Sequence, residues 1–243
     1  MNTSKSAIKK EYRFSAWALA MACASPTVVL AENEISRAIE EITVTAQKRA
    51  ESLQEVPISL IAYSSEGLEK AGIENTLDLQ NATPNLHVSG NVRAGQIFIR
   101  GIGSDRIGAA ADSSSTVHID GVYVSRPEAL LGDFLDVERV EVLRGPQGTL
   151  YGRNSVGGSV NIIAKKPTKE FEANAALEMG NYDKVRSSAT LSGPISDAVS
   201  GRIAYIKSDH NPHTKNLSPK GVDGFGDEDA FLVRGMLDIE INE

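Results

Sequence analysis

The sequence has a single cysteine among its 243 residues, which excludes a disulfide scaffold, a cysteine-rich zinc site and an iron–sulfur cluster. Basic residues are also in deficit, and the formal charge of −7 argues against nucleic-acid binding, which needs a basic surface. Aromatic residues make up only 5%, a low share for a membrane barrel. The hydrophobic and charged fractions are near the globular average, which argues against full disorder, and the length allows one or two domains.

The N-terminal apolar stretch, residues 14–24, is too short to span a membrane, because a transmembrane helix needs about 20 apolar residues. Four basic residues precede it, and a proline and short side chains follow it. This order predicts a secretory signal peptide over residues 1–31, cleaved after Ala31 or, as a second candidate, within residues 22–24. An N-terminal core helix, the alternative, would not need basic residues on one side. Export would leave a chain without cysteine and about ten charges negative.

Residues 32–55 form a polar, charged stretch with one β-prone island, Ile-Thr-Val-Thr-Ala at 42–46. Glutamates precede the island directly, and Lys48 and Arg49 follow it. The pattern predicts an extended and exposed segment rather than part of a core.

Residues 56–167 combine short apolar segments with glycine-rich connections. The residue pattern predicts two short helices, at 65–70 and from 76 to 80. It also predicts five short strands, at 56–63, 96–100, 116–119, 139–143 and 159–163. Short strands mixed with short helices indicate a compact α+β domain.

The pattern changes again after residue 170, where apolar and polar residues alternate strictly. Four strands of an antiparallel meander are predicted, at 171–179, 185–192, 199–206 and 231–241. Two of the connections are short, and the third, residues 208–229, is long. Short turns on one rim and long loops on the other are typical of an outer-membrane barrel. Alternation alone leaves a water-soluble sandwich as the alternative.

No motif in the sequence predicts an enzyme or a nucleotide site. The glycines at 101–103 lack the third glycine of a dinucleotide motif, and residues 152–159 have P-loop spacing with Gly158 in place of the lysine. His210 and His213 lie together in the long loop, as a metal-binding pair or simply as solvated side chains. We predict no catalytic residue, no metal and no cofactor.

Several long segments resemble one family. DVERVEVLRGPQGTLYGRNSVGGSVNIIAKKP (136–167) closely resembles the end of the plug domain of TonB-dependent outer-membrane receptors. EEITVTAQKR (40–49) resembles the TonB box, and residues 56–90, 97–103 and 117–126 are similar to the rest of the plug. The residues after 170 are similar to the first four strands of the 22-stranded barrel.

The resemblance implies a domain order and a fold. We expect a signal peptide (1–31), the TonB box and a linker (32–55), a plug domain (56–167) and the first strands of a barrel (168–243). The expected fold class is an α+β plug domain with a small mixed sheet, followed by about four antiparallel strands of a 22-stranded transmembrane β-barrel. Four strands take 73 residues, so 22 strands would need roughly 400, and we expect a truncated receptor.

The resemblance also assigns roles to residues. The TonB-binding residues are Ile42, Thr43, Val44, Thr45 and Ala46. The plug charges expected to pair with the barrel wall are Glu138, Arg139, Glu141, Arg144 and Arg153. Because acids and bases alternate along this segment, ion pairs within the plug are the alternative. The ligand-facing candidates are Asp105, Arg106, Asp112 and Arg126.

The implied function is TonB-dependent active transport of a scarce nutrient across the outer membrane, with the plug gating the barrel. The implied ligand is a ferric siderophore or a similar compound, and the implied partners are TonB with its inner-membrane energising complex and the lipid around the barrel. A periplasmic plug-only module, which binds TonB or ligand without transport, is the alternative from another functional class.

Overall fold

A computed structural model describes residues 42–91, 94–104, 112–126, 132–218, 221 and 224–241. The predicted signal peptide and two of the ligand-facing candidates, Asp105 and Arg106, lie outside the described residues. No helix in the described part of the chain is both long and apolar enough to cross a membrane.

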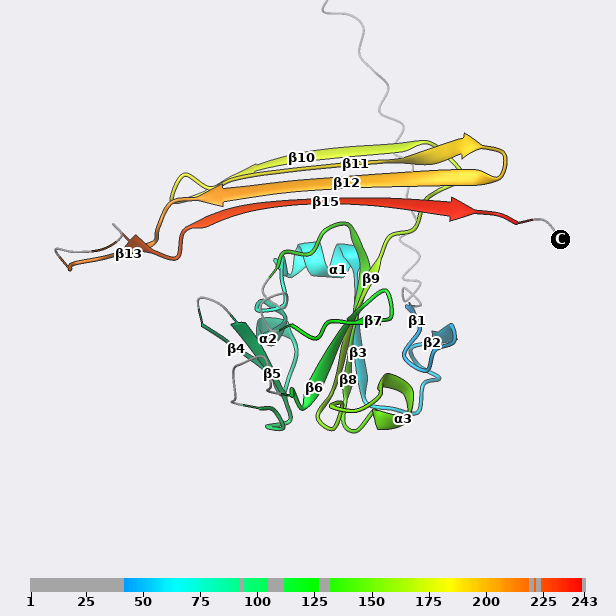
Figure 1. The fold of residues 1–243 in the computed structure, drawn as a ribbon, viewed down its shortest axis with the longest axis horizontal. Helices are drawn as coiled ribbons and strands as arrows, with labels where there is room; N and C mark the ends of the chain where they lie inside the picture. Colours follow the sequence, from blue (N-terminus) through cyan, green and yellow to red (C-terminus); the bar gives the residue numbers. More distant parts are fainter. Residues whose placement is uncertain are drawn as a thin grey trace, which may run out of the picture. The chain divides into compact units, whose positions relative to one another are not determined.

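The first part of the described chain is an α+β domain built on a five-stranded mixed sheet (Figure 1). Its strand order is β3 (Leu60–Ser64), β8 (Val137–Arg144), β9 (Gly158–Ala164), β6 (Ser115–Ile119) and β7 (Val122–Tyr123). Only β6 and β9 run parallel, and the other neighbours are antiparallel. The small mixed sheet predicted from the sequence is therefore confirmed.

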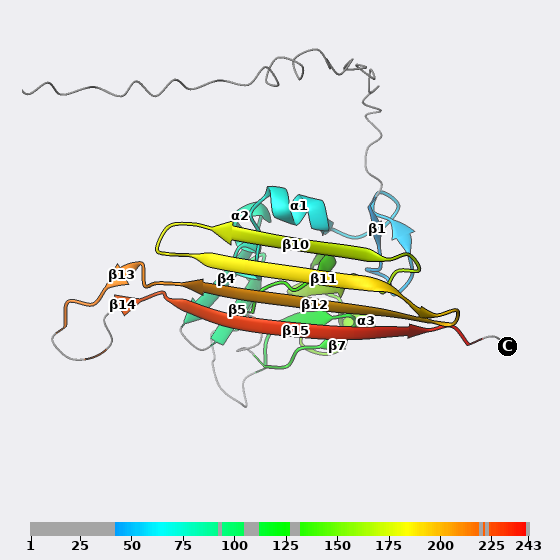
Figure 2. The same ribbon diagram turned by 90° about the horizontal axis from the view of Figure 1, so that it is seen from above.

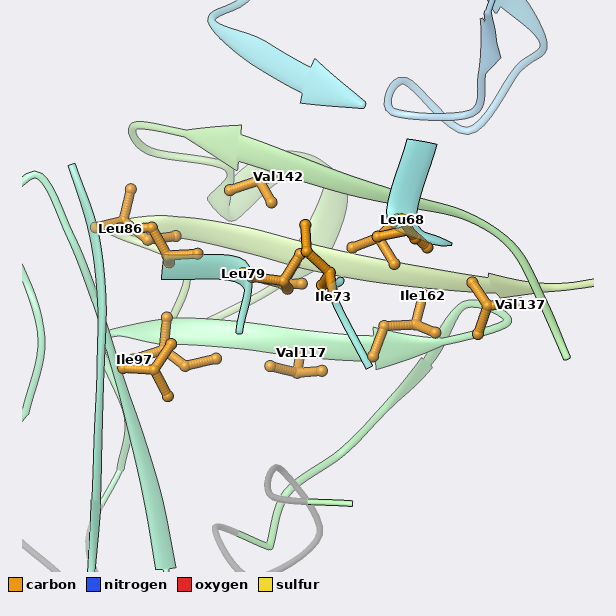
Figure 3. Close-up of a cluster of buried hydrophobic side chains, with 13 residues drawn as sticks. Leu68, Ile73, Leu79, Leu86, Ile97, Val117, Val137, Val142 and Ile162 are labelled. Carbon is orange, nitrogen blue, oxygen red and sulfur yellow. The ribbon is translucent and has the colours of Figure 1, made fainter. Parts of the chain in front are cut away.

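One face of this sheet carries the main hydrophobic core (Figure 3). Alternate residues of β8 and β9, such as Val140, Val142 and Ile162, point into it, as expected for the period of two in a strand. Side chains from the helices cover them, among them Leu68 of α1 (Ser65–Lys70) and Leu79 of α2 (Leu79–Ala82).

Helix α1 begins and ends where its residues predict. The Ser64 hydroxyl accepts the N–H of Gly67 at 3.2 Å, which satisfies one of the free donors of the first turn. Glu66 and Lys70 form an i,i+4 ion pair at 2.6 Å. Gly72 then turns the chain with φ +64°, a conformation that favours glycine.

The α+β domain also contains three short features that the sequence predicted only in part or not at all. A hairpin of β4 (Leu86–Asn91) and β5 (Ala94–Ile99) covers one end of the core, and β5 contains most of the predicted strand at 96–100. A single helical turn, α3 (Gly148–Tyr151), lies in the glycine-rich segment between β8 and β9. Finally, β1 (Thr43–Val44) pairs with β2 (Glu51–Ser52) as a two-residue hairpin.

The second part of the described chain is a four-stranded antiparallel sheet. Figure 2 shows its strands side by side in the order β10 (Glu172–Met179), β11 (Val185–Ser196), β12 (Val199–His210) and β15 (Glu228–Ile239). All four predicted strands are confirmed. The long connection between β12 and β15 contains a small hairpin of β13 (Thr214–Lys215) and β14 (Gly224–Phe225).

This four-stranded sheet has one apolar and one polar face. The apolar face is exposed and includes Leu177, Leu191, Ile203, Phe231 and Leu237. The polar face carries Arg186 on β11, Arg202 on β12 and Arg234 on β15, and the buried apolar side chains of Ala204 and Ile206 lie among them. The alternation therefore sorts the side chains as the sequence predicted.

Candidate functional site

The second face of the five-stranded sheet carries a buried row of polar side chains. His118, Asn161 and Glu141 occupy neighbouring positions across β6, β9 and β8, because His118 pairs with Asn161 and Asn161 with Glu141. All three are buried, and Glu141 has no exposed surface. A buried carboxylate needs hydrogen-bond donors around it. We call these three residues the polar row.

Residues 42–46 lie against the polar row and form the docked segment. The backbone N–H of Thr45 donates to Glu141 Oε1 at 2.7 Å, and the Thr45 hydroxyl lies 3.3 Å from the same oxygen. Arg139 Nη2 donates to the Thr45 hydroxyl at 3.1 Å. Val44 and Ala46 are fully buried. The prediction of an exposed segment was therefore wrong, because its alternate side chains fill a small second core.

Tyr151, at the end of α3, also binds the docked segment. Its hydroxyl donates to the carbonyl of Ala46 at 2.9 Å and accepts from Asn161 Nδ2 at 2.7 Å. Burial raises the pKa of Tyr151 to about 12, so the phenol keeps the proton that it donates. The Tyr151 ring also packs in the same small core as Val44 and Leu143.

His118 ends the polar row as a neutral side chain. Its Nδ1 lies 3.2 Å from the Ser159 hydroxyl, and its ring contacts that of Tyr151 edge-on, at 5.1 Å between centroids. Burial lowers the pKa of His118, and the positive charge of Lys48 lowers it further. The Lys48 ammonium itself lies 4.5 Å from the centroid of the Tyr151 ring. The docked segment thus closes a continuous polar network that spans three strands.

Three of the charges predicted to meet the barrel wall, Glu138, Arg139 and Glu141, pair with each other. Arg139 Nε lies 2.9 Å from Glu141 Oε1, and Arg139 also pairs with Glu138. All three are on β8, so these are ion pairs within the α+β domain. Arg144 is half-buried and Arg153 is exposed, and the described residues show no ion pair of either with the four-stranded sheet.

The ion pairs between the α+β domain and the four-stranded sheet use other acids, beside an apolar contact of Leu135 with Ala204 and Ile206. Arg202 donates two hydrogen bonds to the Asp136 carboxylate, from Nε to Oδ2 at 2.5 Å and from Nη2 to Oδ1 at 2.7 Å. Both side chains are only 4% exposed. Arg234 Nη2 donates to the Asp136 carbonyl at 2.8 Å. Two arginines on adjacent strands therefore hold the side chain and the backbone of one residue, an arrangement that we call the Asp136 clamp.

A second group of contacts lies nearer the long-loop rim of the sheet. Glu74 pairs with Arg186 and with Lys184, the latter at 3.3 Å. Asp133 lies 3.9 Å from Arg186. Burial raises the pKa of Asp133 to about 6, with Arg186 opposing the rise and three nearby carboxylates adding to it. Sequence reasoning found Arg186 through its alternation but missed its acidic partners, because they lie in loops.

The ligand-facing candidates that the structure describes lie at one end of the β6–β7 pair. Asp112 precedes β6 and Arg126 follows β7, and the antiparallel pairing of His118 with Tyr123 carries both toward the same end. Both side chains are exposed.

The histidine pair of the long loop makes no metal centre with its described neighbours. The rings of His210 and His213 are 6.4 Å apart, and His210 Nε2 lies 3.4 Å from Glu228. Among the described residues, no group of three His, Cys, Asp or Glu side chains is arranged to hold a metal ion.

A small mixed-sheet domain, joined by buried ion pairs to antiparallel strands with one apolar face, is the arrangement expected of a plug domain followed by the first strands of a barrel. Comparison with known families agrees, since residues 52–159 match the model of the TonB-dependent Receptor Plug Domain. Residues 52–159 are therefore a plug domain of the TonB-dependent receptor type, and the chain is similar to receptors of that kind over most of its length.

Known relatives extend the match beyond the plug. The iron-regulated outer membrane virulence protein of Vibrio cholerae is 27% identical over 215 residues, which cover 84% of this chain and 32% of that protein. The crystal structure of the ferric yersiniabactin uptake receptor of Yersinia pestis has a TM-score of 0.66 and 29% identity, covering 75% of this chain and 29% of that one.

The pyoverdine outer membrane receptor of Pseudomonas aeruginosa, bound to pyoverdine, has a TM-score of 0.68 and 25% identity. The match covers 82% of this chain and 28% of that one. The chain thus spans about a third or less of the length of these relatives.

Proposed function

We propose that this chain belongs to a receptor that takes up a ferric siderophore across the outer membrane at the expense of energy delivered by TonB. The similarity to receptors for ferric yersiniabactin and pyoverdine supports the ligand class. The outer-membrane receptors among the relatives support the location, and the predicted signal peptide would direct the export. The apolar face of the four-stranded sheet would face the lipid.

The observation that carries the proposal is the docking of residues 42–46 on the plug sheet. An extended segment of this kind can bind a partner by adding a strand to its sheet, with main-chain hydrogen bonds supplying much of the affinity. In the docked state, however, the Thr45 N–H is held by Glu141, and Val44 and Ala46 are buried. TonB would therefore bind the segment after it has left the polar row.

A pull on the segment would then act directly on the plug sheet. Thr45 and Ala46 are joined by hydrogen bonds to Glu141 on β8 and to Tyr151 on α3. The Asp136 clamp holds the start of the same β8 strand against β12 and β15. The pulling force would thus act on β8 between two points. One is the set of hydrogen bonds to the docked segment, which can break, and the other is the Asp136 clamp at the start of the strand. Asp105, Arg106, Asp112 and Arg126 are our candidates for contacts with the ligand.

The test is the substitution Val44→Pro in a complete receptor that contains this chain. Proline removes a backbone N–H and resists a central strand position, so strand addition by TonB should fail. We expect loss of energised uptake of the ferric siderophore with unchanged binding of the same ligand to cells. Val44→Ile, which keeps the β-branched side chain, is the control and should transport normally.

Unchanged uptake in Val44→Pro would contradict the role of the docked segment. Binding of TonB or ligand by the wild-type chain without any uptake would instead favour the plug-only periplasmic module.

A further inference from the structure

The hydrogen bonds of the polar row have fixed directions, which follow from which atoms can donate. The Ala46 carbonyl only accepts, so the Tyr151 hydroxyl donates to it, at 2.9 Å. Because its one proton is then used, this hydroxyl accepts from Asn161 Nδ2, at 2.7 Å. The Glu141 carboxylate also only accepts, and its Oε2 lies 3.4 Å from the same nitrogen. The amide nitrogen of Asn161 is therefore directed to Tyr151 and Glu141, and the amide oxygen accepts from a different donor.

The same argument assigns the proton of His118. The Asn161 amide oxygen only accepts, so the Ser159 hydroxyl donates to it, at 3.0 Å. This hydroxyl has one proton, so it accepts at its second contact, 3.2 Å from His118 Nδ1. His118 therefore carries a proton on Nδ1. The resulting series of donors, which we call the donor chain, runs from His118 through Ser159, Asn161 and Tyr151 to Ala46.

The donor chain divides at Asn161, and both branches end on the docked segment. One branch reaches the Ala46 carbonyl through the Tyr151 hydroxyl. The other branch reaches the Glu141 carboxylate, whose Oε1 accepts the Thr45 N–H at 2.7 Å. Both groups that hold the docked segment therefore depend on the orientation of one buried amide.

His118 is the first donor of the chain, and its ring is held from two sides. The centroid of the ring lies 5.6 Å from that of Tyr123 on β7 and 5.1 Å from that of Tyr151. His118 is only 4% exposed, and Ser159 is fully buried. In the described part of the chain, no other side chain donates to Ser159. Without His118, a hydroxyl shielded from bulk water would lose its donor.

We propose that His118 is a positioning residue for TonB-dependent transport. Its Nδ1–H orients Ser159 and Asn161, and through them the two groups that hold the docked segment until TonB binds it. While the donor chain is complete, the segment stays on the polar row and TonB cannot pair with it. The proposal rests on the role of residues 42–46 given under Proposed function.

A positive charge on His118 should favour release of the docked segment. The titratable groups around its ring are, by element, Tyr123 on β7, Tyr151 on α3, Lys48 after the docked segment, Asp120 after β6, and Glu141 with Arg139 on β8. Burial lowers the pKa of His118 from 6.5, and the charge of Lys48 lowers it further. Because Lys48 leaves with the segment, the pKa of His118 rises on release. The released state therefore binds more protons, so the docked state is favoured above about pH 6.5 and weakened below it.

The test separates the hydrogen bond from the ring, in a complete receptor that contains this chain. His118→Phe keeps a ring between Tyr123 and Tyr151 but has no donor. His118→Asn loses the ring but places an amide nitrogen near the position of Nδ1. Amide hydrogen exchange of residues 42–47, corrected for intrinsic rates, should be about fivefold faster in His118→Phe, the effect of one hydrogen bond. In His118→Asn it should stay within about twofold of the wild type.

Two further variants and a change of pH locate the effect. Ser159→Ala removes the next donor and leaves the His118 ring in place, so it should speed the exchange as His118→Phe does. His87→Phe is the matched control, because the exposed His87 ring lies on β4 outside the donor chain, and it should change nothing. Lowering the pH from about 7.5 to about 6 should speed the corrected exchange in the wild type but not in His118→Phe or His118→Asn.

TonB binding gives the functional readout. The periplasmic domain of TonB is titrated onto the receptor without ligand. Because only the released segment can pair with this domain, the apparent affinity is the intrinsic affinity reduced by the released fraction. His118→Phe should therefore raise the TonB affinity about fivefold while binding of the ferric siderophore stays unchanged. His118→Asn should bind TonB as the wild type does.

Faster exchange in His118→Asn than in His118→Phe would mean that ring packing holds the segment, and would overturn the proposal. Equal exchange in the two variants would overturn it too. If the exchange differs as expected but TonB binds none of the variants, the proposed function fails while the hydrogen-bonding role of His118 holds.

Discussion

The carboxylate of Glu141 accepts the backbone N–H of Thr45 at 2.7 Å, although the two residues lie 96 positions apart in the chain. The same carboxylate oxygen accepts Arg139 Nε at 2.9 Å. Because Glu141 is completely buried, each of these donors helps to compensate its desolvated charge. When the docked segment leaves, the carboxylate loses the backbone N–H and the hydroxyl of Thr45 as donors. The docked state and the charge of Glu141 therefore stabilise each other.

Glu141→Gln should weaken the attachment of the docked segment to the sheet while keeping the shape of the side chain at position 141. The amide has nearly the volume of the carboxylate, but the hydrogen bond from Thr45 is no longer assisted by a charge, a difference of about 1–2 kcal/mol. We expect amide hydrogen exchange in residues 42–47 to become about tenfold faster, measured by mass spectrometry on a complete receptor. Glu138→Gln, at a half-exposed partner of Arg139, should leave this exchange unchanged. Equal exchange in both variants would contradict the prediction.

Tyr151→Phe should have a similar effect through a different bond. The substitution keeps the ring and removes the hydroxyl that donates to Ala46 and accepts from Asn161, at a cost of about 1–3 kcal/mol. Faster exchange and earlier protease cleavage within residues 42–50 are expected. Tyr63→Phe is a matched control, because the Tyr63 hydroxyl donates to Ala82 on the other side of the sheet. If Tyr63→Phe released the segment as much as Tyr151→Phe does, Tyr151 would have no specific role.

The sequence predicted the regular parts of this chain because alternation is a local signal. The strands after residue 170 were found from their period of two, and Arg186, Arg202 and Arg234 were placed on one face by the same pattern. The long segment around β8 and β9 was found by its resemblance to a plug domain, which the family match confirms.

The docked segment was missed because flanking charges were given more weight than alternation. Ile42, Val44 and Ala46 alternate with two threonines, the pattern of a half-buried strand, and this signal could have predicted the burial. The burial of its partner Glu141 could not be predicted from the residue type, since a glutamate within a strand usually occupies an exposed position. Only the pairing of distant strands shows that it is buried.

The partners of the sheet arginines were missed for a different reason. Asp136 and Glu74 lie in connections without periodicity, and their side chains reach the sheet only because of the tertiary fold. Asp136 adopts φ +50°, a conformation that aspartate and asparagine tolerate better than most residues. Neither feature can be read from a single sequence.

Asp136→Asn should weaken the attachment of the plug to β12. Asparagine tolerates the same backbone conformation, so the substitution isolates the loss of charge opposite Arg202, whose side chain is almost fully buried. Removing one partner of a buried ion pair costs up to about 3–5 kcal/mol. We expect a smaller destabilisation here, seen as faster amide exchange of β8, because Arg202 also lies 3.6 Å from Glu172. Asp120→Asn is the control, because Asp120 also has a positive φ, of +49°, but binds the Ala164 N–H within the plug. Unchanged exchange in Asp136→Asn would show that the clamp does not hold the plug.

Asp133 should make the stability of the plug depend on pH below neutrality. Burial raises its pKa from 3.8 to about 6, so between these values the folded chain binds more protons than the unfolded chain. The contribution of Asp133 to the free energy of unfolding therefore falls as the pH rises from about 4 to about 6, and is constant above that range.

Asp133→Asn removes the titrating group and should flatten this part of the pH profile, measured by amide exchange of the plug at a series of pH values. Asp112→Asn, at an exposed position, should leave the profile as in the wild type. A wild-type stability that rose through the same pH window, with no difference in Asp133→Asn, would mean that Arg186 holds the Asp133 carboxylate ionised despite its burial.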